Sequence, residues 1–257
     1  MRRKRARAVV GELLERVVVA PPSELHRERA NEDRSDPFDY TVVIPAYNES
    51  ANLPLLLERL RKVTRNVIIV DDGSTDRTAK IGKRFGFRVV RHWRNLGKGA
   101  AVRSGLRTAP TEKIVLMDGD NQHSPYEIPA LLQKLNGADL VVGDRFARRA
   151  ALPLHRRLAN ALIRAIVGLR APHVRDPLCG FRALRKNRVR FEEDGFDADL
   201  GMLFNALESG LRVESTPVSV SYAIEPKSAS KTSSLFTGVK EYAGLLACAL
   251  RWAAGLR

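Results

Sequence analysis

Cysteine is scarce in this sequence, and a secretion signal is not evident. The 257 residues contain two cysteines, Cys179 and Cys248, which are too few for the disulfide framework of a small secreted domain. The basic start of the chain is not followed by an apolar segment with a small-residue cleavage site, as it would be in a signal peptide. We therefore expect a reducing, cytoplasmic location.

Long apolar runs and nucleic-acid-binding motifs are also missing. The longest uncharged run near the C-terminus extends from Tyr242 to Leu250, whereas a membrane-spanning helix needs about 20 apolar residues. The sequence has no zinc-ligand spacing, no aromatic motif of the RNA-recognition type and no helix-turn-helix signal. These absences argue against a nucleic-acid-binding protein, the alternative that the positive charge would otherwise suggest.

Positive charge is abundant and unevenly distributed. The formal net charge is +15, and residues 145–190 contain thirteen Lys or Arg but one acid, Asp176. Such a block attracts any polyanion, including anionic lipid headgroups and phosphorylated substrates, or it is simply a solvated face. Charge alone does not choose among these partners.

Short apolar segments alternate with helical patterns from residue 40 onward. The segments TVVIPAY, NVIIVDD, FRVVRH, KIVLMDGD and DLVVGDR have the composition of buried strands, and residues 52–63 and 76–85 of helices between them. This alternation predicts one α/β domain with a mostly parallel central sheet covered by helices on both faces.

Polar residues cluster where these predicted strands end. Tyr47 and Glu49 follow the first strand, Asp72 ends the second, and Asp118 and Asp120 follow the fourth. Ligands of parallel sheets bind beyond the carboxyl ends of the strands. We therefore expect these side chains to meet at one edge of the sheet.

The segment MDGDNQH, residues 117–123, offers oxygen ligands for a divalent cation. In an extended chain Asp118 and Asp120 point to the same side, with Gln122 two residues further on. Mg²⁺ typically takes one or two carboxylates together with substrate phosphates. An ordinary solvent-facing Asp-Gly turn is the alternative interpretation of the same residues.

Two further segments are less specific. In VDDGSTD, residues 70–76, Ser74 or Thr75 could cap a helix, and the repulsion between Asp71 and Asp72 suggests that a donor-rich ligand such as a ribose or a nucleobase compensates one of them. The glycine-rich NLGKGAAVRSG, residues 95–105, contains Lys98 but is not a Walker motif. No Ser/His/Asp arrangement for nucleophilic catalysis is evident.

Two amphipathic, cationic segments follow the predicted strands. Residues 156–169 and the stripe from Leu235 to Ala253 have helical spacing, with Lys or Arg on the polar faces. They could pack on the domain or lie in a membrane interface. We divide the chain into a basic N-terminal extension and linker (1–36), the α/β domain (37–232) and a C-terminal amphipathic, membrane-associating helix (233–257).

Six segments, taken in order, resemble the family-2 glycosyltransferases with a GT-A fold. They are VVIPAYNES, VDDGSTD, NLGKGAAVRSG, MDGDNQHSP, VVGDRF and DPLCGFRALRK, and among family members the dolichyl-phosphate mannose and glucose synthases are the most similar. The resemblance implies a membrane-associated transferase that moves a hexose from a nucleotide-diphosphate sugar to dolichyl or polyprenyl phosphate, with Mg²⁺ or Mn²⁺ as cofactor. The implied location is peripheral, on the cytoplasmic face of a membrane, with an anionic membrane surface and a membrane subunit as further partners.

The resemblance also implies roles for individual residues. Asp118, Asp120 and Arg145 would be catalytic, and Asp120 and Gln122 would ligate the metal. Substrate binding would fall to ten residues: Pro45, Tyr47, Glu49, Val70, Asp72, Asp118, Gly119, Arg145, Arg156 and Lys231. The segment before Lys231 departs from the family pattern, because Glu225 stands where an arginine is common.

The chemistry implied is an inverting displacement on the sugar. A phosphate monoester has a second pKa of about 6, so the lipid phosphate is largely ionised and needs no strong general base. GDP-mannose is the donor that we favour, with UDP-glucose or UDP-N-acetylglucosamine as alternatives. A non-catalytic membrane scaffold is a further alternative, but it would leave the acids at three strand ends without a role.

Overall fold

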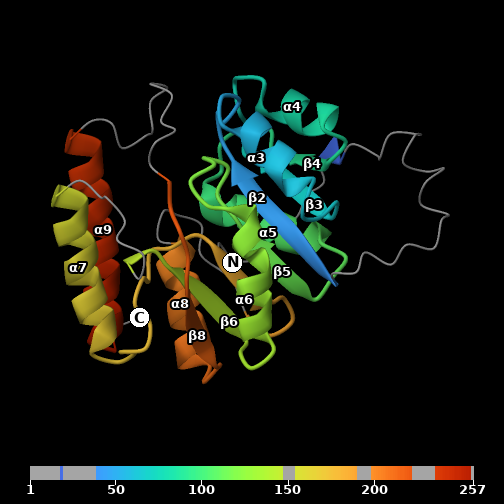
Figure 1. Ribbon diagram of the computed structural model, residues 1–257. Coiled ribbons are helices and arrows are strands. Elements are labelled where there is room, and N and C mark those ends of the chain that lie inside the picture. Colours follow the sequence, from blue (N-terminus) through green and yellow to red (C-terminus); the bar gives the residue numbers. More distant parts are fainter. Residues whose placement is uncertain (1–17, 20–38, 147–153, 190–197, 222–234, 256–257) are drawn as a thin grey trace, which may run out of the picture.

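The computed structural model describes residues 18–19, 39–146, 154–189, 198–221 and 235–255 (Figure 1). One mixed sheet contains every described strand, in the order β1-β4-β3-β2-β5-β7-β6-β8. The strands are β1 (Val18–Val19), β2 (Tyr40–Ala46), β3 (Val67–Asp71), β4 (Arg88–Arg91), β5 (Lys113–Leu116), β6 (Leu140–Asp144), β7 (Arg182–Arg185) and β8 (Val213–Pro217).

Seven α-helices surround this sheet in the described residues. They are α3 (Leu53–Leu60), α4 (Thr78–Arg84), α5 (Lys98–Thr108), α6 (Ile128–Leu135), α7 (Leu154–Gly168), α8 (Ala198–Glu208) and α9 (Leu235–Ala253). A 3₁₀ turn, η2 (Pro125–Glu127), precedes α6. The predicted α/β class with a mostly parallel sheet is confirmed.

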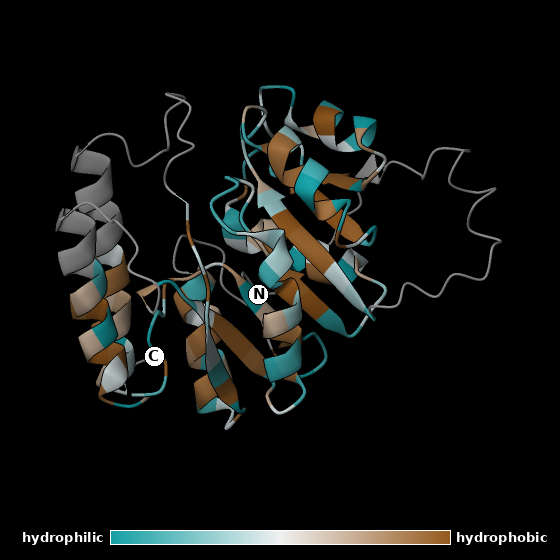
Figure 2. Ribbon diagram, in the orientation of Figure 1, coloured by the Kyte–Doolittle hydropathy of each residue, from teal (hydrophilic) through white to brown (hydrophobic). Residues whose placement is uncertain are grey.

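The order of the strands places helices on both faces of the sheet. Strands β2, β3 and β4 are parallel neighbours, so the right-handed connections through α3 and α4 lie on one face. The chain then returns past β2 to β5, which pairs with β2 in parallel, and this reversal puts α5 on the other face. Figure 2 shows the apolar strands between these helices.

The core is built from the inward faces of strands and helices. In α3, Leu53, Leu56, Leu57 and Leu60 are fully buried, at the i, i+3, i+4, i+7 spacing of one helix face. Strand β3 is buried along its whole length, as expected for a central strand with helices on both sides. The core therefore fixes the register of the strands whose ends carry the polar residues.

Strand β7 was not predicted from the sequence. It runs antiparallel between β5 and β6. Its segment FRALRK is short and interrupted by charges, so it lacks the continuous apolar run by which β2 to β6 were predicted; β1 and β8 were not predicted either. Since β7 runs in the opposite direction, its beginning lies at the edge where the parallel strands end.

Helices α7 and α9 lie side by side at the left of Figure 1, beyond the end of the sheet. They correspond to the two amphipathic segments predicted from the sequence. In the part of the chain that the structure describes, no helix combines the length and apolar character needed to span a membrane.

Candidate active site at the carboxyl edge of the sheet

The predicted convergence of polar residues is confirmed by the strand register. Ala46 at the end of β2 pairs with Asp71 at the end of β3, and Val43 of β2 pairs with Leu116 at the end of β5. Residues 47–49, 72 and 118–120 therefore follow strands that end at one edge. Strand β6 runs in the same direction as β5, so Arg145 comes to this edge as well.

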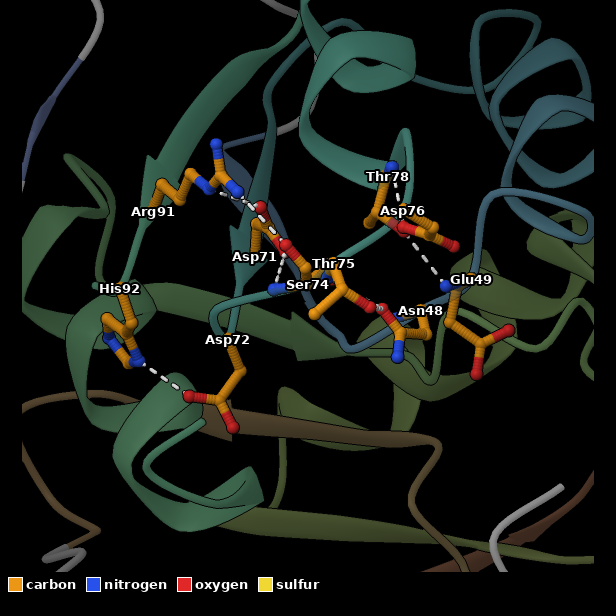
Figure 3. A network of polar contacts seen from close by, with 10 residues as sticks. All are labelled: Asn48, Glu49, Asp71, Asp72, Ser74, Thr75, Asp76, Thr78, Arg91 and His92. Carbon is orange, nitrogen blue, oxygen red and sulfur yellow. Dashed lines mark hydrogen bonds and ion pairs between the residues drawn. The ribbon is translucent and has the colours of Figure 1, made fainter. Parts of the chain in front are cut away.

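The loop after β2 is held by the loop after β3 (Figure 3). Asn48 has a left-handed backbone (φ 57°), and its N–H donates to Ser74 Oγ at 2.9 Å. The Glu49 N–H donates to Thr78 Oγ1, also at 2.9 Å. These bonds fix the backbone beside Glu49, whose carboxylate accepts a 2.9 Å bond from Asn52 Nδ2.

The protein itself compensates both adjacent acids at the end of β3. Asp71 accepts the Ser74 N–H at 3.0 Å, and its Oδ2 lies 3.1 Å from Arg91 Nε. The buried Asp72 carboxylate contacts His92 Nδ1 at 2.7 Å (Figure 3) and accepts backbone N–H groups at Leu96 and Gly97. The repulsion between Asp71 and Asp72 therefore does not by itself require a ligand, because side chains and amides distant in the sequence offset it.

The loop after β5 carries the Asp118–Asp120 pair. Strand β5 ends at Leu116, so Asp118 lies beyond the strand and Asp120 lies in a turn, and the extended-chain argument for their orientation was wrong. Lys98 Nζ lies 2.7 Å from Asp118 Oδ1 and 2.8 Å from Asp199 Oδ2. Burial acts to raise the pKa of Asp118, but the charge of Lys98 outweighs it and the pKa is lowered.

Asp120 has the opposite shift. Burial raises its pKa to about 7, and the negative charges of Asp118 and Glu49 add to the effect. Its Oδ1 accepts the Gln122 N–H at 3.1 Å. A carboxylate whose charge is disfavoured in this way is one that a cation would stabilise.

The donor set at this loop fits a hard divalent cation in company with a phosphorylated ligand. Carboxylate and amide oxygens are preferred by Mg²⁺, which usually retains water or substrate ligands. Within the described ranges, no three His, Cys, Asp or Glu side chains are grouped to hold a metal alone. The residues present thus suit a cation that takes its remaining ligands from a diphosphate.

Arg145 is held in place by Asp176, the one acid among the basic residues 145–190. Its Nε lies 2.6 Å from Asp176 Oδ2 and its NH2 group lies 2.9 Å from Oδ1, a bidentate arrangement that fixes the guanidinium plane. The positive charge of Arg145 contributes to lowering the pKa of Asp118. The structure therefore brings Arg145 into the electrostatic field of the acidic pair.

His123 is buried behind the acidic loop. Its ring stacks on Phe181 with the ring centres 5.1 Å apart, and its backbone forms a β-bridge with Val220. Burial lowers the pKa of His123 to about 4. The ring is therefore neutral at physiological pH and is suited to packing.

The other predicted site residues differ in their location and burial. Val70 is fully buried in β3, between Pro45 of β2 and Val90 of β4. Gly119 is buried at the edge itself. Arg156 lies in α7, and Lys231 lies outside the described residues. Tyr47 is half-buried directly after β2.

Sequence analysis missed three features of this edge. Asp199, the second residue of α8, pairs with Lys98, and one acid among the five of the segment FEEDGFDADL gave no distinct signal. Lys98 was noted in a glycine-rich loop, whereas it is the first residue of α5. Ser104, His92 and Asp72 form a hydrogen-bonded chain that the sequence did not indicate, because α5 and the ends of β4 and β3 meet only in the fold.

Comparison with known proteins gives consistent matches. Residues 41–190 match the family model described as Glycosyl transferase family 2. A dolichol-phosphate mannosyltransferase of Pyrococcus furiosus is 33% identical over 164 residues, covering 58% of this chain and 47% of that protein. An undecaprenyl-phosphate mannosyltransferase of Micrococcus luteus is 30% identical over 200 residues, covering 69% and 81%. The chain thus spans about half the length of the first relative.

A solved structure shares the fold. Glucosyl-3-phosphoglycerate synthase from Mycobacterium tuberculosis, in complex with Mn²⁺, uridine diphosphate and phosphoglyceric acid, superposes with a TM-score of 0.66 at 21% identity. The superposition covers 85% of this chain and 79% of that one. At this identity the likeness concerns the arrangement of the strands and helices.

Proposed function

Because the chain belongs to glycosyl transferase family 2, we propose that this glycosyltransferase moves a hexose from a nucleotide-diphosphate sugar to the phosphate of a polyprenyl lipid. The acceptor class is supported by the names of the two relatives, which act on dolichol phosphate and undecaprenyl phosphate. GDP-mannose is the donor that we favour, since both relatives are named mannosyltransferases.

The observation that carries this proposal is the paired but unequal acids at the carboxyl edge. Asp118 is held ionised by Lys98, whereas Asp120 has a pKa raised to about 7 by burial and by its acidic neighbours. Asp120 and Gln122 would hold Mg²⁺ or Mn²⁺, which when bound supplies Lewis-acid stabilisation of the departing diphosphate. Asp118 would contact the nucleotide sugar.

The remaining charged residues would bind different parts of the two substrates. Arg145, with its guanidinium fixed by Asp176, would meet the diphosphate or the acceptor phosphate. Glu49 and Asp72 would accept bonds from the nucleotide, with Asp72 offering its one lone pair that internal donors leave unused. Arg156 and Lys231 would attract the lipid phosphate.

The transfer itself needs little acid-base chemistry from the protein. The lipid phosphate is largely ionised at neutral pH, so its oxygen attacks the anomeric carbon directly while the nucleoside diphosphate leaves. Displacement at an α-linked donor inverts the centre and gives a β-linked lipid sugar. His123, buried and neutral, keeps a packing role in this scheme.

One assay tests the proposal and identifies the donor. The protein is incubated with labelled GDP-mannose, UDP-glucose or UDP-N-acetylglucosamine, each with polyprenyl phosphate, and with Mg²⁺, Mn²⁺ or a chelator. We expect a labelled lipid product with GDP-mannose that disappears with the chelator. A product with a uridine donor instead would correct the sugar, and no lipid product with any donor would refute the proposed transfer.

We also propose that the enzyme works at a membrane surface, on the cytoplasmic side. Leu162 of α7, Leu169 directly after α7 and Leu250 of α9 are 49%, 79% and 52% exposed, and Arg164 and Arg251 are exposed on the same two helices. Apolar side chains beside cationic ones are typical of helices that lie in a lipid interface. This would bring the site to a phosphate whose chain lies in the bilayer.

A further inference from the structure

A buried hydrogen-bonded chain lies next to the proposed transfer site but outside its chemistry. His92 Nδ1 is 2.7 Å from Asp72 Oδ1, and His92 Nε2 is 2.8 Å from Ser104 Oγ. His92 follows β4, Asp72 follows β3 and Ser104 is in α5, so three elements meet here. Figure 3 shows His92 and Asp72 facing each other from adjacent strand ends.

The direction of the bond between His92 and Asp72 follows from the carboxylate, whose oxygens accept, so His92 Nδ1 is the donor. The Ser104 hydroxyl can either donate to His92 Nε2 or accept from it, so it pairs with this nitrogen in both protonation states of the ring. His92 thus offers Asp72 one donor in a fixed direction, while Ser104 holds the orientation of the ring.

Asp72 also accepts two backbone N–H groups, which order the chain ahead of α5. Oδ1 also accepts the Leu96 N–H at 2.9 Å, and Oδ2 accepts the Gly97 N–H at 2.8 Å. Gly97 caps α5 with a φ of 94°, a left-handed conformation that favours glycine. The carboxylate therefore determines where α5 begins.

The first residue of α5 is the lysine of the site. Lys98 follows Gly97 directly, and its Nζ bridges Asp118 and Asp199 at 2.7 and 2.8 Å. Burial alone would lower the pKa of Lys98, but the two carboxylates outweigh it and raise the pKa above its usual 10.5. A shift of α5 by a fraction of its first turn would separate this ammonium from Asp118.

We propose that His92 is a positioning residue, which acts through Asp72 and the amides of Leu96 and Gly97 to hold Lys98 against Asp118. The proposal rests on the transfer function only for its effect on rate. Its structural part, the ordering of residues 96–97 by a buried histidine, stands independently. Neither His92 nor Ser104 contacts the reacting groups in this scheme.

Two substitutions separate the positioning role from simple packing. In His92→Asn the side-chain amide lies where Nδ1 lies and can still donate to Asp72. In His92→Gln the amide lies near the position of Nε2, so the bond to Ser104 can persist while the bond to Asp72 is lost. Both variants remove the ring, so a difference between them reports the bond to Asp72.

Hydrogen exchange of residues 93–98 tests, without any substrate, whether His92 orders the amides of Leu96 and Gly97 through Asp72. We expect about tenfold faster exchange of the Leu96 and Gly97 amides in H92Q, and exchange close to wild type in H92N. Thermal unfolding of both variants is recorded as a check on the fold. Equal exchange in H92Q and wild type, or equal acceleration in both variants, would overturn the proposal.

A double-mutant cycle with Lys98→Met tests the second step. We expect H92Q to lower kcat by about tenfold or more through displacement of Lys98. The double variant H92Q/K98M should then be no slower than K98M alone, because the route through Lys98 is already lost. Rate losses that multiply would show that His92 acts independently of Lys98. If wild-type protein transfers no sugar, the proposed function fails, while hydrogen exchange still decides the ordering role.

Discussion

At the residue scale, the site depends on how each acid is neutralised. Among the described residues, Asp71 and Asp72 have internal partners, Asp118 pairs with Lys98, and Asp120 accepts one backbone N–H, from Gln122, and has a pKa near 7. The least compensated acid is therefore the one predicted to bind the metal. This difference makes Asp120 the most informative residue to change.

We predict that Asp120→Ala abolishes transfer while the fold persists. The substitution removes a charge that the cation and the diphosphate need, and loss of one such group typically costs at least about a hundredfold in rate. Initial rates at saturating Mn²⁺, with unfolding followed by circular dichroism, provide the measurement. Glu58→Ala, which removes an exposed acid on α3, is the control and should retain full activity. Unchanged turnover of D120A would exclude this metal site.

The pH dependence of stability provides a second prediction for Asp120. Its folded-state pKa of about 7 lies above the usual 3.8, so the native state holds a proton that the unfolded state loses first. Stability from this group is complete below pH 4 and is lost as the pH rises to 7. In chelator, Asp120→Asn should therefore stabilise the protein at pH 8.5 more than at pH 4.5, by up to a few kcal/mol.

Thermal unfolding of both proteins at the two pH values measures this effect. Added Mn²⁺ should stabilise the wild type at pH 8.5 and leave D120N nearly unchanged, because only an ionised carboxylate binds the cation well. If, in chelator, D120N were more stable than the wild type by the same amount at pH 4.5 and at pH 8.5, the raised pKa of Asp120 would be contradicted.

At the scale of elements, strand β7 organises the half of the site that sequence analysis missed. Its antiparallel direction brings the residues before it, including Asp176 and Gly180, to the carboxyl edge. Arg182 at its start is fully buried and donates to the carbonyls of Pro177, Cys179 and Asp199. One strand thus positions the anchor of Arg145 and the start of α8.

We predict that Gly180→Ala inactivates the enzyme without unfolding it. A β-carbon at this position would collide with Asp118 Oδ2 and lie 2.8 Å from Lys98 Nζ. Both are ends of flexible side chains, so they can move and the fold survives, but the Lys98–Asp118 contact is lost. We expect kcat to fall by about tenfold to a hundredfold with little change in melting temperature.

Gly168→Ala is the matched control for this prediction, since a β-carbon at Gly168 meets no atom within 4 Å. It should have the activity and melting temperature of the wild type. If G180A retained wild-type turnover, the geometry of the Lys98–Asp118 contact would not matter for transfer.

At the scale of the whole molecule, charge and shape suggest a direction of approach to a membrane. The net charge is +15, and helices α7 and α9 stand together at one end of the sheet (Figure 1). In Figure 2 their described parts carry apolar and polar residues side by side. Basic side chains near an anionic surface contribute about 1 kcal/mol each, over a Debye length of about 8 Å.

We predict that the protein binds anionic vesicles in two components. Binding should fall steeply as salt screens the basic residues, while the inserted leucines leave a fraction that salt does not remove. Co-sedimentation with anionic and neutral vesicles across a salt series measures both. Protein that stays in the supernatant with anionic vesicles at low salt would exclude direct membrane binding and require a partner subunit.

Leu169→Ser isolates the apolar component. It should reduce the salt-resistant fraction, because the side chain of Leu169, directly after α7, is 79% exposed. Leu55→Ser is the matched control, since Leu55 is 40% exposed on α3, away from α7 and α9. Equal effects of the two substitutions would indicate that any exposed leucine promotes vesicle binding, and that binding is not directed through α7 and α9.

The sequence by itself determined the α/β class, the parallel strands and the edge where Glu49, Asp72 and Asp118 meet. These follow from local patterns: apolar runs make central strands, and parallel strands place the residues after them at a common edge. The acids of the 117–123 segment could be found because they stand directly after such a run. The family resemblance added roles that spacing alone could not assign.

Only the tertiary structure decided the partners of these residues. Lys98 meets Asp118 and Asp199, and His92 meets Asp72 and Ser104, across separations in sequence that no local pattern encodes. The pKa of Asp120 likewise depends on burial and on charges brought near by folding. Electrostatic interactions act through space, so the charge state of this site was fixed by the packing of strands and helices rather than by the order of residues in the chain.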